Sequence, residues 1–230
     1  LIALVLAKYL SDSTIALHFY LVTSILTIVC SLILLKYDEN EEVGGVEDEP
    51  FSIMKYLAFW ISLLFMQISF GGFYNFFTIY TTENGISLET ASYLWSFGVL
   101  CEIIMLYFQG SILKNNLLLL IKFSIFVTVI RWIIVYMFPD NLTILFISQS
   151  IHAFSFGLYH SAVIVYLYTM YSNKKLAQQF MFGVAYGLGG FIGAFVAGWL
   201  YGEYLFLYSA VFALVAFAAL HIHSKKYITV

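Results

Sequence analysis

Charged residues are scarce in this chain: they make up 10% of its 230 residues, against about 25% in a typical soluble domain. The sequence has two prolines, two cysteines and a single arginine, Arg131. Cys30 and Cys101 lie apart in apolar runs, which argues against a disulfide framework or a cysteine metal site. The low polarity excludes a soluble domain, and the lack of a basic patch argues against nucleic-acid binding.

Hydrophobic residues dominate instead, at 62% of the chain, and they fall into long runs. A membrane-spanning helix needs ~20 mostly apolar residues. The runs predict an all-α integral membrane protein with seven spans: 14–35, 52–80, 90–113, 117–138, 142–171, 176–199 and 204–221. Residues 1–10 resemble the end of an earlier span. Because the first residue is Leu inside this apolar run, we expect the sequence to be a fragment.

Lysines gather at one end of the alternating spans, and acidic residues occupy most of the opposite loops. The lysines at the first end are Lys36, Lys55, Lys114, Lys122, Lys174, Lys175, Lys225 and Lys226. Positive residues favour the cytoplasmic side of a membrane. We therefore predict a multi-pass protein of the cytoplasmic (inner) or plasma membrane, with its C-terminus in the cytoplasm.

An acidic segment, residues 36–51, divides the chain. One span and a partial span precede it, and six spans follow. This order is typical of a transporter built from two six-helix halves. We predict that residues 1–35 end the N-terminal half, 36–51 form a cytoplasmic linker, 52–224 form the C-terminal half of a twelve-helix protein, and 225–230 form a cytoplasmic tail. The bilayer and the missing N-terminal helices are then obligatory partners.

Three ionisable residues share one depth in three successive spans. At a rise of ~1.5 Å per residue, Arg131, Glu102 and His152 all lie roughly 10–18 Å from the outer ends of their helices. A charge at this depth is costly and usually marks a pathway or a binding site. We expect Arg131 to neutralise Glu102. Two alternatives remain open: a static ion pair that joins two helices, and a carboxyl that carries a proton.

The span 142–171 has one polar and aromatic face, on which we expect Gln149, His152, Tyr159 and His160. Histidine gains and loses a proton near neutral pH, which suits it to proton relay or to hydrogen bonding with a solute. A second stripe in the span 52–80 includes Gln67 and Asn75, which we expect to line a cavity or to bond neighbouring helices. His221 and His223, near the end of the last span, are predicted to be surface residues.

Glycine is the expected source of helix irregularity, because both prolines lie at span edges. Gly71–Gly72 predicts a bend or local unwinding. The glycine-rich run 183–198 predicts close packing between helices, with a role in rocking between two states as the alternative.

The segment FISQSIHAFSFGLYHSA, residues 146–162, resembles the Q-x-L-H-A-x-T-F-G-x-x-H-x-A signature of the phenylpropionic acid permease family. That family belongs to the major facilitator superfamily and is related to the lactose permease. The pair Arg131–Trp132, Glu102 in its helix and the glycine-rich segment 185–202 are also similar to the family. The resemblance covers about residues 50–224.

The resemblance implies that Arg131 and His152 occupy places like those of the membrane arginine and histidine of the lactose permease, which there serve proton coupling and sugar binding. One turn after that histidine the lactose permease has an acidic residue, where this chain has Ser155. Glu102 is then the acidic residue left at depth to carry the proton.

The leading hypothesis is a secondary active transporter that imports a small organic solute with protons by alternating access. An aromatic carboxylate such as phenylpropionate is a candidate, because Arg131 could receive its carboxylate. In this hypothesis Glu102 and His152 couple the proton, while Arg131, Gln149, His160, Tyr159, Asn75 and Gln67 bind solute or line the cavity. The alternatives are a receptor or interaction subunit on the same fold and, less favoured, a membrane enzyme. We expect no cofactor and no metal.

Overall fold

The computed structural model describes residues 13–34 and 51–227, and its chain divides into two compact units, Leu1–Asp48 and Glu49–Val230. In the first unit the described residues form helix α2, Ser13–Leu34. The expected partial span 1–10 and most of the acidic linker 36–51 lie outside the described residues. Helix α2 is apolar over Leu17–Ile33, a stretch shorter than the six spans of the second unit.

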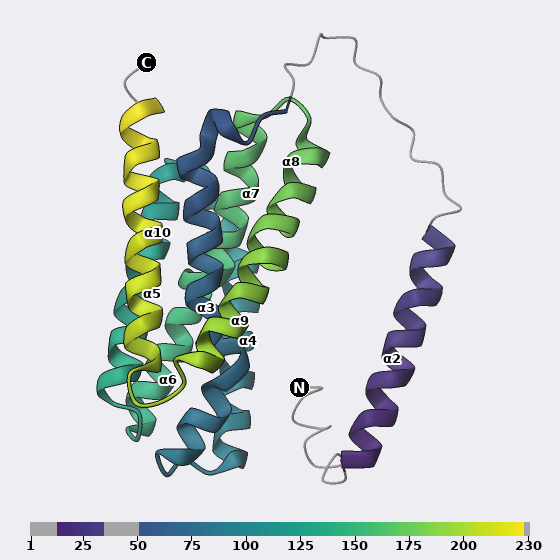
Figure 1. The fold of residues 1–230 in the computed structure, drawn as a ribbon, viewed down its shortest axis with the longest axis vertical. Helices are drawn as coiled ribbons and strands as arrows, with labels where there is room; N and C mark the ends of the chain where they lie inside the picture. Colours follow the sequence, from purple (N-terminus) through teal and green to yellow (C-terminus); the bar gives the residue numbers. More distant parts are fainter. Residues whose placement is uncertain (1–12, 35–50, 228–230) are drawn as a thin grey trace. The chain divides into compact units, whose positions relative to one another are not determined.

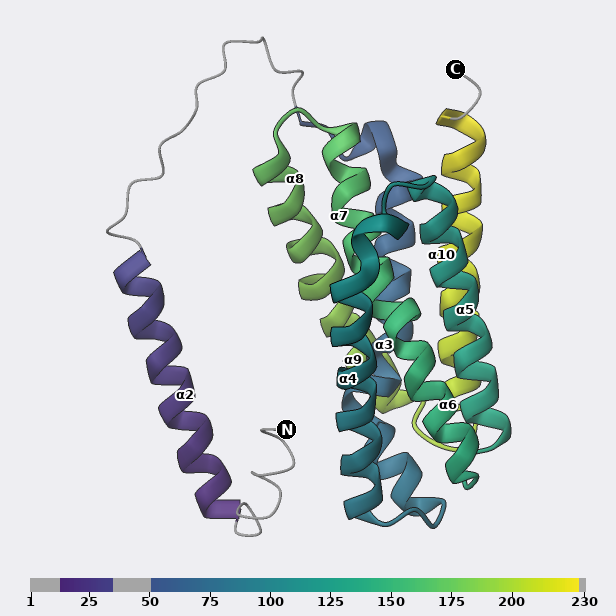
Figure 2. The same ribbon diagram turned by 180° about the vertical axis from the view of Figure 1, so that it is seen from behind.

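Six helices of membrane length form the second unit, so the six spans expected after the linker are confirmed. In Figure 1 they form one bundle, and Figure 2 shows α4, α5 and α6 from behind. The elements are a 3₁₀ turn η1, Met54–Tyr56, followed by α3, Leu57–Glu83; α4, Leu88–Ile112; α5, Leu117–Met137; α6, Leu142–His152, η2, Ala153–Leu158, and α7, Tyr159–Met170; α8, Lys174–Met181, η3, Phe182–Gly189, and α9, Gly190–Trp199; and α10, Leu205–Tyr227.

Polar residues in the short connections set where several helices begin. Asn116, Asn141 and Asn173 each precede a helix, and each side chain accepts a hydrogen bond from the backbone N–H three residues later. Ser87 does the same for α4. Such caps satisfy N–H groups that have no partner inside the helix and contribute about 1 kcal/mol each. These caps explain why the helix starts lie close to the predicted boundaries.

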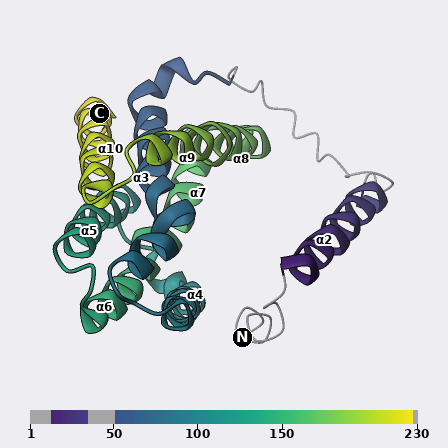
Figure 3. The same cartoon turned by 60° about the horizontal axis from the view of Figure 1, so that its bottom comes forward.

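Helix α3 packs against α10 on one side and against η3 and α9 on the other, as the end view in Figure 3 shows. A Cβ added at Gly71 would lie 2.2 Å from the carbonyl oxygen of Gly193. A Cβ at Gly193 would meet the backbone of Ile68 at 3.0 Å. The prediction of close packing for the glycine-rich run is therefore confirmed at Gly193, because two helix backbones touch there.

The local unwinding that was one expectation for Gly71–Gly72 does not occur, because α3 continues as an α-helix through both residues. Their lack of a side chain makes room for neighbouring helices instead. Irregularity lies elsewhere, in two π-helical segments, η2 and η3, in the middle of their spans. Single π-helical turns inside α-helices occur frequently at functional sites.

Gly71→Ala should lower the stability of the bundle markedly. The new Cβ would overlap backbone atoms of Gly193, which cannot rotate away as a side chain would. Overpacking commonly costs about 1–3 kcal/mol, and a backbone overlap belongs at the upper end of that range. Thermal unfolding of the purified protein would measure the loss.

Gly110→Ala is the matched control for this substitution, because nothing lies within 4 Å of its added Cβ. Since alanine favours helix more than glycine does, this variant should unfold at the wild-type temperature or above it. Equal unfolding temperatures for the two variants would contradict the close contact of α3 with α9.

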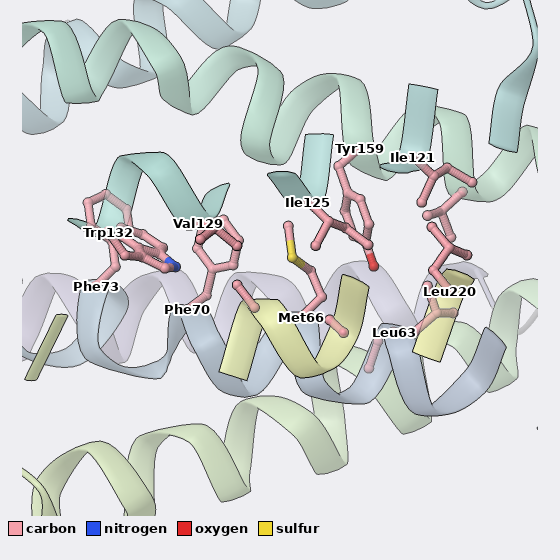
Figure 4. Packing of buried hydrophobic residues seen from close by; sticks show 14 of the residues in the cluster. Leu63, Met66, Phe70, Phe73, Ile121, Ile125, Val129, Trp132, Tyr159 and Leu220 are labelled. Carbon is pink, nitrogen blue, oxygen red and sulfur yellow. The ribbon is translucent and has the colours of Figure 1, made fainter. Parts of the chain in front are cut away.

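An aromatic core joins the helices of the bundle. In Figure 4 Phe70, Phe73 and Trp132 lie together, and Tyr159 lies near Ile125 and Met66. The Phe70 and Trp132 rings meet edge to face at 5.1 Å, an arrangement that aromatic pairs prefer. The core therefore continues from α3 into α5 close to Arg131.

The prediction that His223 is a surface residue is wrong, whereas His221 is exposed. The His223 side chain is buried between helices, and its Nε2 atom lies 2.9 Å from the Tyr166 hydroxyl of α7. The sequence placed it near the end of a span but did not show that α10 turns this face toward α7.

Candidate functional site

Arg131 is fully enclosed, with no exposed surface, and its guanidinium is held by α6 and η2. Nε donates to the backbone oxygen of Ser148 at 2.9 Å, and Nη2 donates to Oε1 of Gln149 at 3.3 Å. Nη1 lies 2.9 Å from Nδ1 of His152 and 3.4 Å from Oγ of Ser155. The cost of burying this charge is thus offset by a set of acceptors on one neighbouring span.

Aromatic rings cover the rest of the guanidinium. Its central carbon lies 4.2 Å from the centre of the Phe73 ring and 4.5 Å from that of Trp132. A cation over an aromatic face is stabilised by the ring quadrupole, and more strongly where water is excluded. Phe73 of α3 and Trp132 of α5 therefore complete the enclosure of Arg131.

The contact with Arg131 fixes the protonation pattern of His152. A guanidinium carries only donors, so Nδ1 of His152 must accept the hydrogen bond. The proton of the neutral ring then sits on Nε2. This nitrogen lies 3.7 Å from Oε2 of Glu102 on α4. Arg131 therefore directs the N–H group of His152 toward the Glu102 carboxyl.

Glu102 is the most exposed of the three residues Arg131, His152 and Glu102, which contact one another in this order. About 20% of its side chain is exposed, against 6% for His152 and none for Arg131. Gly157 of η2 makes room for it, because a Cβ there would lie 3.2 Å from Cγ of Glu102. We name the three residues Arg131, His152 and Glu102 the polar relay.

The expected direct pairing of Arg131 with Glu102 is replaced by this relay. Among the described residues, Glu102 makes its ion-pair contact with His152, and His152 stands between the two charges. The common depth predicted for the three residues agrees with these contacts. The order of the contacts depends on how α4, α5 and α6 are rotated against one another, which spacing within a helix does not reveal.

Gln149 lies in the same cluster, where it is buried against α4. Its Oε1 atom accepts from Arg131, while its Nε2 atom has no hydrogen-bond partner among the described residues. A Cβ added at Gly98 would lie 2.8 Å from that Oε1 atom. The glycine on α4 is therefore what allows the Gln149 amide to reach the guanidinium.

His160 belongs to a second group of polar residues further along the span. Its Nδ1 atom lies 2.5 Å from the hydroxyl of Tyr186 in η3, and the side chain of Gln67 in α3 lies beside the same tyrosine. The Phe156 ring stacks between His152 and His160, at 5.4 and 6.1 Å. We name His160, Tyr186 and Gln67 the tyrosine cluster; it joins the two π-helical spans to α3.

Tyr186 was missed by the sequence reasoning, although it stands in the glycine-rich run that was singled out for packing. The sequence feature that could have indicated Tyr186 is a polar aromatic residue among glycines, at the depth of His160. Ser148 was missed as well, because it acts through its backbone oxygen. The residue type does not show which backbone oxygen will accept a hydrogen bond from a side chain.

The structure places Tyr159 and Asn75 in different surroundings. Tyr159 is buried in the core with 2% of its surface exposed, and its hydroxyl has no hydrogen-bond partner among the described residues. The predicted polar face assumed a rotation of 100° per residue, and the π-helical segment η2 between His152 and Tyr159 departs from it. Asn75 is exposed, and its side chain donates to the carbonyl of Gly71 in its own helix.

Over the described ranges 13–34 and 51–227, no group of three His, Cys, Asp or Glu side chains is placed to hold a metal ion. The relay combines a permanent cation, a neutral imidazole and a carboxyl at the edge of an aromatic core.

The sequence matches the MFS_1 like family over residues 2–211. The chain belongs to this family, and with its six helices of membrane length it is an integral, multi-pass membrane protein. It is also similar to the "Probable 3-phenylpropionic acid transporter" of Escherichia coli (strain K12), with 28% identity over 169 residues. That match covers 70% of this chain and 42% of the relative's length. Together the matches confirm the resemblance inferred from the sequence.

Proposed function

We propose that this chain holds the end of the N-terminal half and the whole C-terminal six-helix half of a twelve-helix transporter that carries a small organic anion together with a proton. The family and the named relative support membrane transport rather than an enzymatic activity. The polar relay is the observation that supports proton coupling in this proposal. It ends at the partly exposed Glu102 and holds a positive charge behind His152.

The relay suggests how one proton and one anion bind together. When Glu102 is ionised, its carboxylate attracts the Nε2–H of His152, which lies 3.7 Å away. Protonation of Glu102 weakens this attraction and frees the N–H group for the carboxylate of a solute. Loss of the proton restores the first arrangement. Carboxylate and proton therefore bind together and leave together.

Arg131 acts through His152 in this mechanism, because its own donors are enclosed and occupied. Its charge makes the His152 N–H a stronger donor and keeps the imidazole neutral. This role replaces the direct capture of a carboxylate by Arg131 that the sequence suggested. An incoming anion meets His152 and Glu102 before it can reach the guanidinium.

An aromatic carboxylate fits the surroundings of the relay. Tyr74, which is 44% exposed, lies 6.0 Å from Phe156 between ring centres, and Phe156 lies 6.3 Å from Tyr186. These rings offer faces and edges to an aromatic solute while the relay offers the N–H donor. The relative's name points to the same class, as a 3-phenylpropionic acid transporter.

Transport in proteoliposomes tests this proposal. When the outside is one pH unit more acidic, the full-length protein should take up labelled phenylpropionate at a higher initial rate than protein-free vesicles, toward a ratio of about tenfold for one proton per anion, because one pH unit is worth about 1.4 kcal/mol. Protein-free vesicles correct for diffusion of the neutral acid. The uncharged amide analogue should not accumulate. Absence of protein-dependent flux for every aromatic carboxylate tested would favour a receptor or interaction subunit instead.

A further inference from the structure

A cavity of about 320 Å³ lies at the lysine-bearing end of the bundle, away from the polar relay. It is formed where η1 and the start of α3 meet the end of α10. The hydroxyl of Tyr227 donates to the backbone oxygen of Lys55, which joins the two walls. The walls include Lys55, Ala58, Ile61, Ile222, His223 and Lys226.

The lining divides into a charged part and an apolar part. Lys55 and Lys226 are exposed at the end of the bundle and supply the charge. Each ammonium group lies over a tyrosine ring, Lys55 over Tyr56 at 5.5 Å and Lys226 over Tyr227 at 5.4 Å. The apolar part, with Ala58, Ile61 and Ile222, runs along the helices from this charged end toward the membrane interior.

His223 adds a buried polar group to the wall of the cavity. Its Nε2 atom is bonded to Tyr166, but its Nδ1 atom has no hydrogen-bond partner within the described part of the chain. Only 1% of the side chain is exposed. Buried polar atoms are nearly always paired, so His223 leaves one nitrogen unsatisfied next to the cavity.

We propose that this cavity binds an anionic phospholipid, with the phosphate of the headgroup between Lys55 and Lys226 and an acyl chain along Ala58, Ile61 and Ile222. Basic pockets between membrane helices on the cytoplasmic side suit acidic headgroups. The predicted orientation puts the lysine-bearing end on that side. A soluble phosphate would use the lysines but not the apolar wall, and a zwitterionic lipid would gain less from two positive charges.

Native mass spectrometry of the full-length protein with added lipids tests the site. The wild type should bind phosphatidylglycerol more tightly than phosphatidylcholine. The double variant K55Q/K226Q should bind phosphatidylglycerol roughly 25-fold more weakly, since a lysine near an anionic surface contributes about fivefold each. The control K114Q/K174Q removes two lysines from the same end but outside the cavity, and should bind as the wild type does.

Ala58→Phe keeps every charge and fills the apolar part of the cavity, so it should also weaken phosphatidylglycerol binding. Glycerol phosphate at millimolar concentration should not displace the lipid. Equal binding of the two lipids by the wild type, unchanged binding by K55Q/K226Q, or full displacement by glycerol phosphate would each overturn the proposal. Wild-type unfolding temperatures would show that the variants are folded.

Discussion

Glu102→Gln should abolish accumulation of the solute against its gradient while exchange across the membrane continues. A glutamine side chain cannot take up a proton, but it has nearly the shape of the protonated carboxyl. In a one-unit pH gradient, the accumulation ratio should fall from about ten to one. Counterflow of labelled against unlabelled solute should persist, because it requires no net movement of protons.

Glu89→Gln is the matched control for this variant. Glu89 also lies on α4, but at the exposed start of the helix, where it accepts a hydrogen bond from the Tyr93 hydroxyl. It should accumulate solute as the wild type does. Full accumulation by Glu102→Gln would remove Glu102 from proton coupling and leave the relay a structural contact between α4 and α6.

Arg131→Gln should produce the largest loss of stability among substitutions in the relay, together with loss of transport. The guanidinium holds Ser148, Gln149 and His152 at once. Its removal leaves buried acceptors unpaired and takes away the positive charge behind Glu102. Removing one partner of a buried charged network commonly costs about 3–5 kcal/mol. Thermal unfolding and proteoliposome uptake would measure the two effects.

Arg131→Lys separates charge from geometry. Lysine keeps the positive charge but presents it as a point, without the planar fork that reaches several acceptors. We expect a folded protein whose accumulation ratio is close to one, because His152 is no longer held in one orientation. Lys122→Met, on the same helix, removes a cation bonded to Ser224 and should leave accumulation unchanged. Wild-type accumulation by Arg131→Lys would show that charge alone suffices.

The class of the protein and the limits of its helices followed from local features of the chain. The span predicted at 117–138 is α5, Leu117–Met137, and the one predicted at 90–113 is α4, Leu88–Ile112. Runs of apolar residues and asparagine or serine caps act within a few residues of one another, so they can be read along the sequence. The depth of Arg131, Glu102 and His152 followed from the same spacing.

The spacing did not predict which residues Arg131, Glu102 and His152 contact. Membrane helices are apolar on most faces, so the sequence gives little indication of which face meets a neighbour. For this reason Tyr159 was expected beside His152 but lies in the core, and His223 was expected at the surface but is buried. The π-helical segment η2 adds to the difficulty, because it changes the rotation of every residue after Ala153.

By itself the sequence determined that this is an all-α membrane protein and that a lone arginine shares its depth with a glutamate and a histidine. Only the tertiary structure decided that His152 stands between Arg131 and Glu102, and that Gly71 makes room for Gly193. The physical reason is the same in both cases. The hydropathy of a segment depends on the residues of one helix, so it can be read from the sequence. A contact between side chains depends on how two helices are rotated and how closely they approach, and the sequence does not show this.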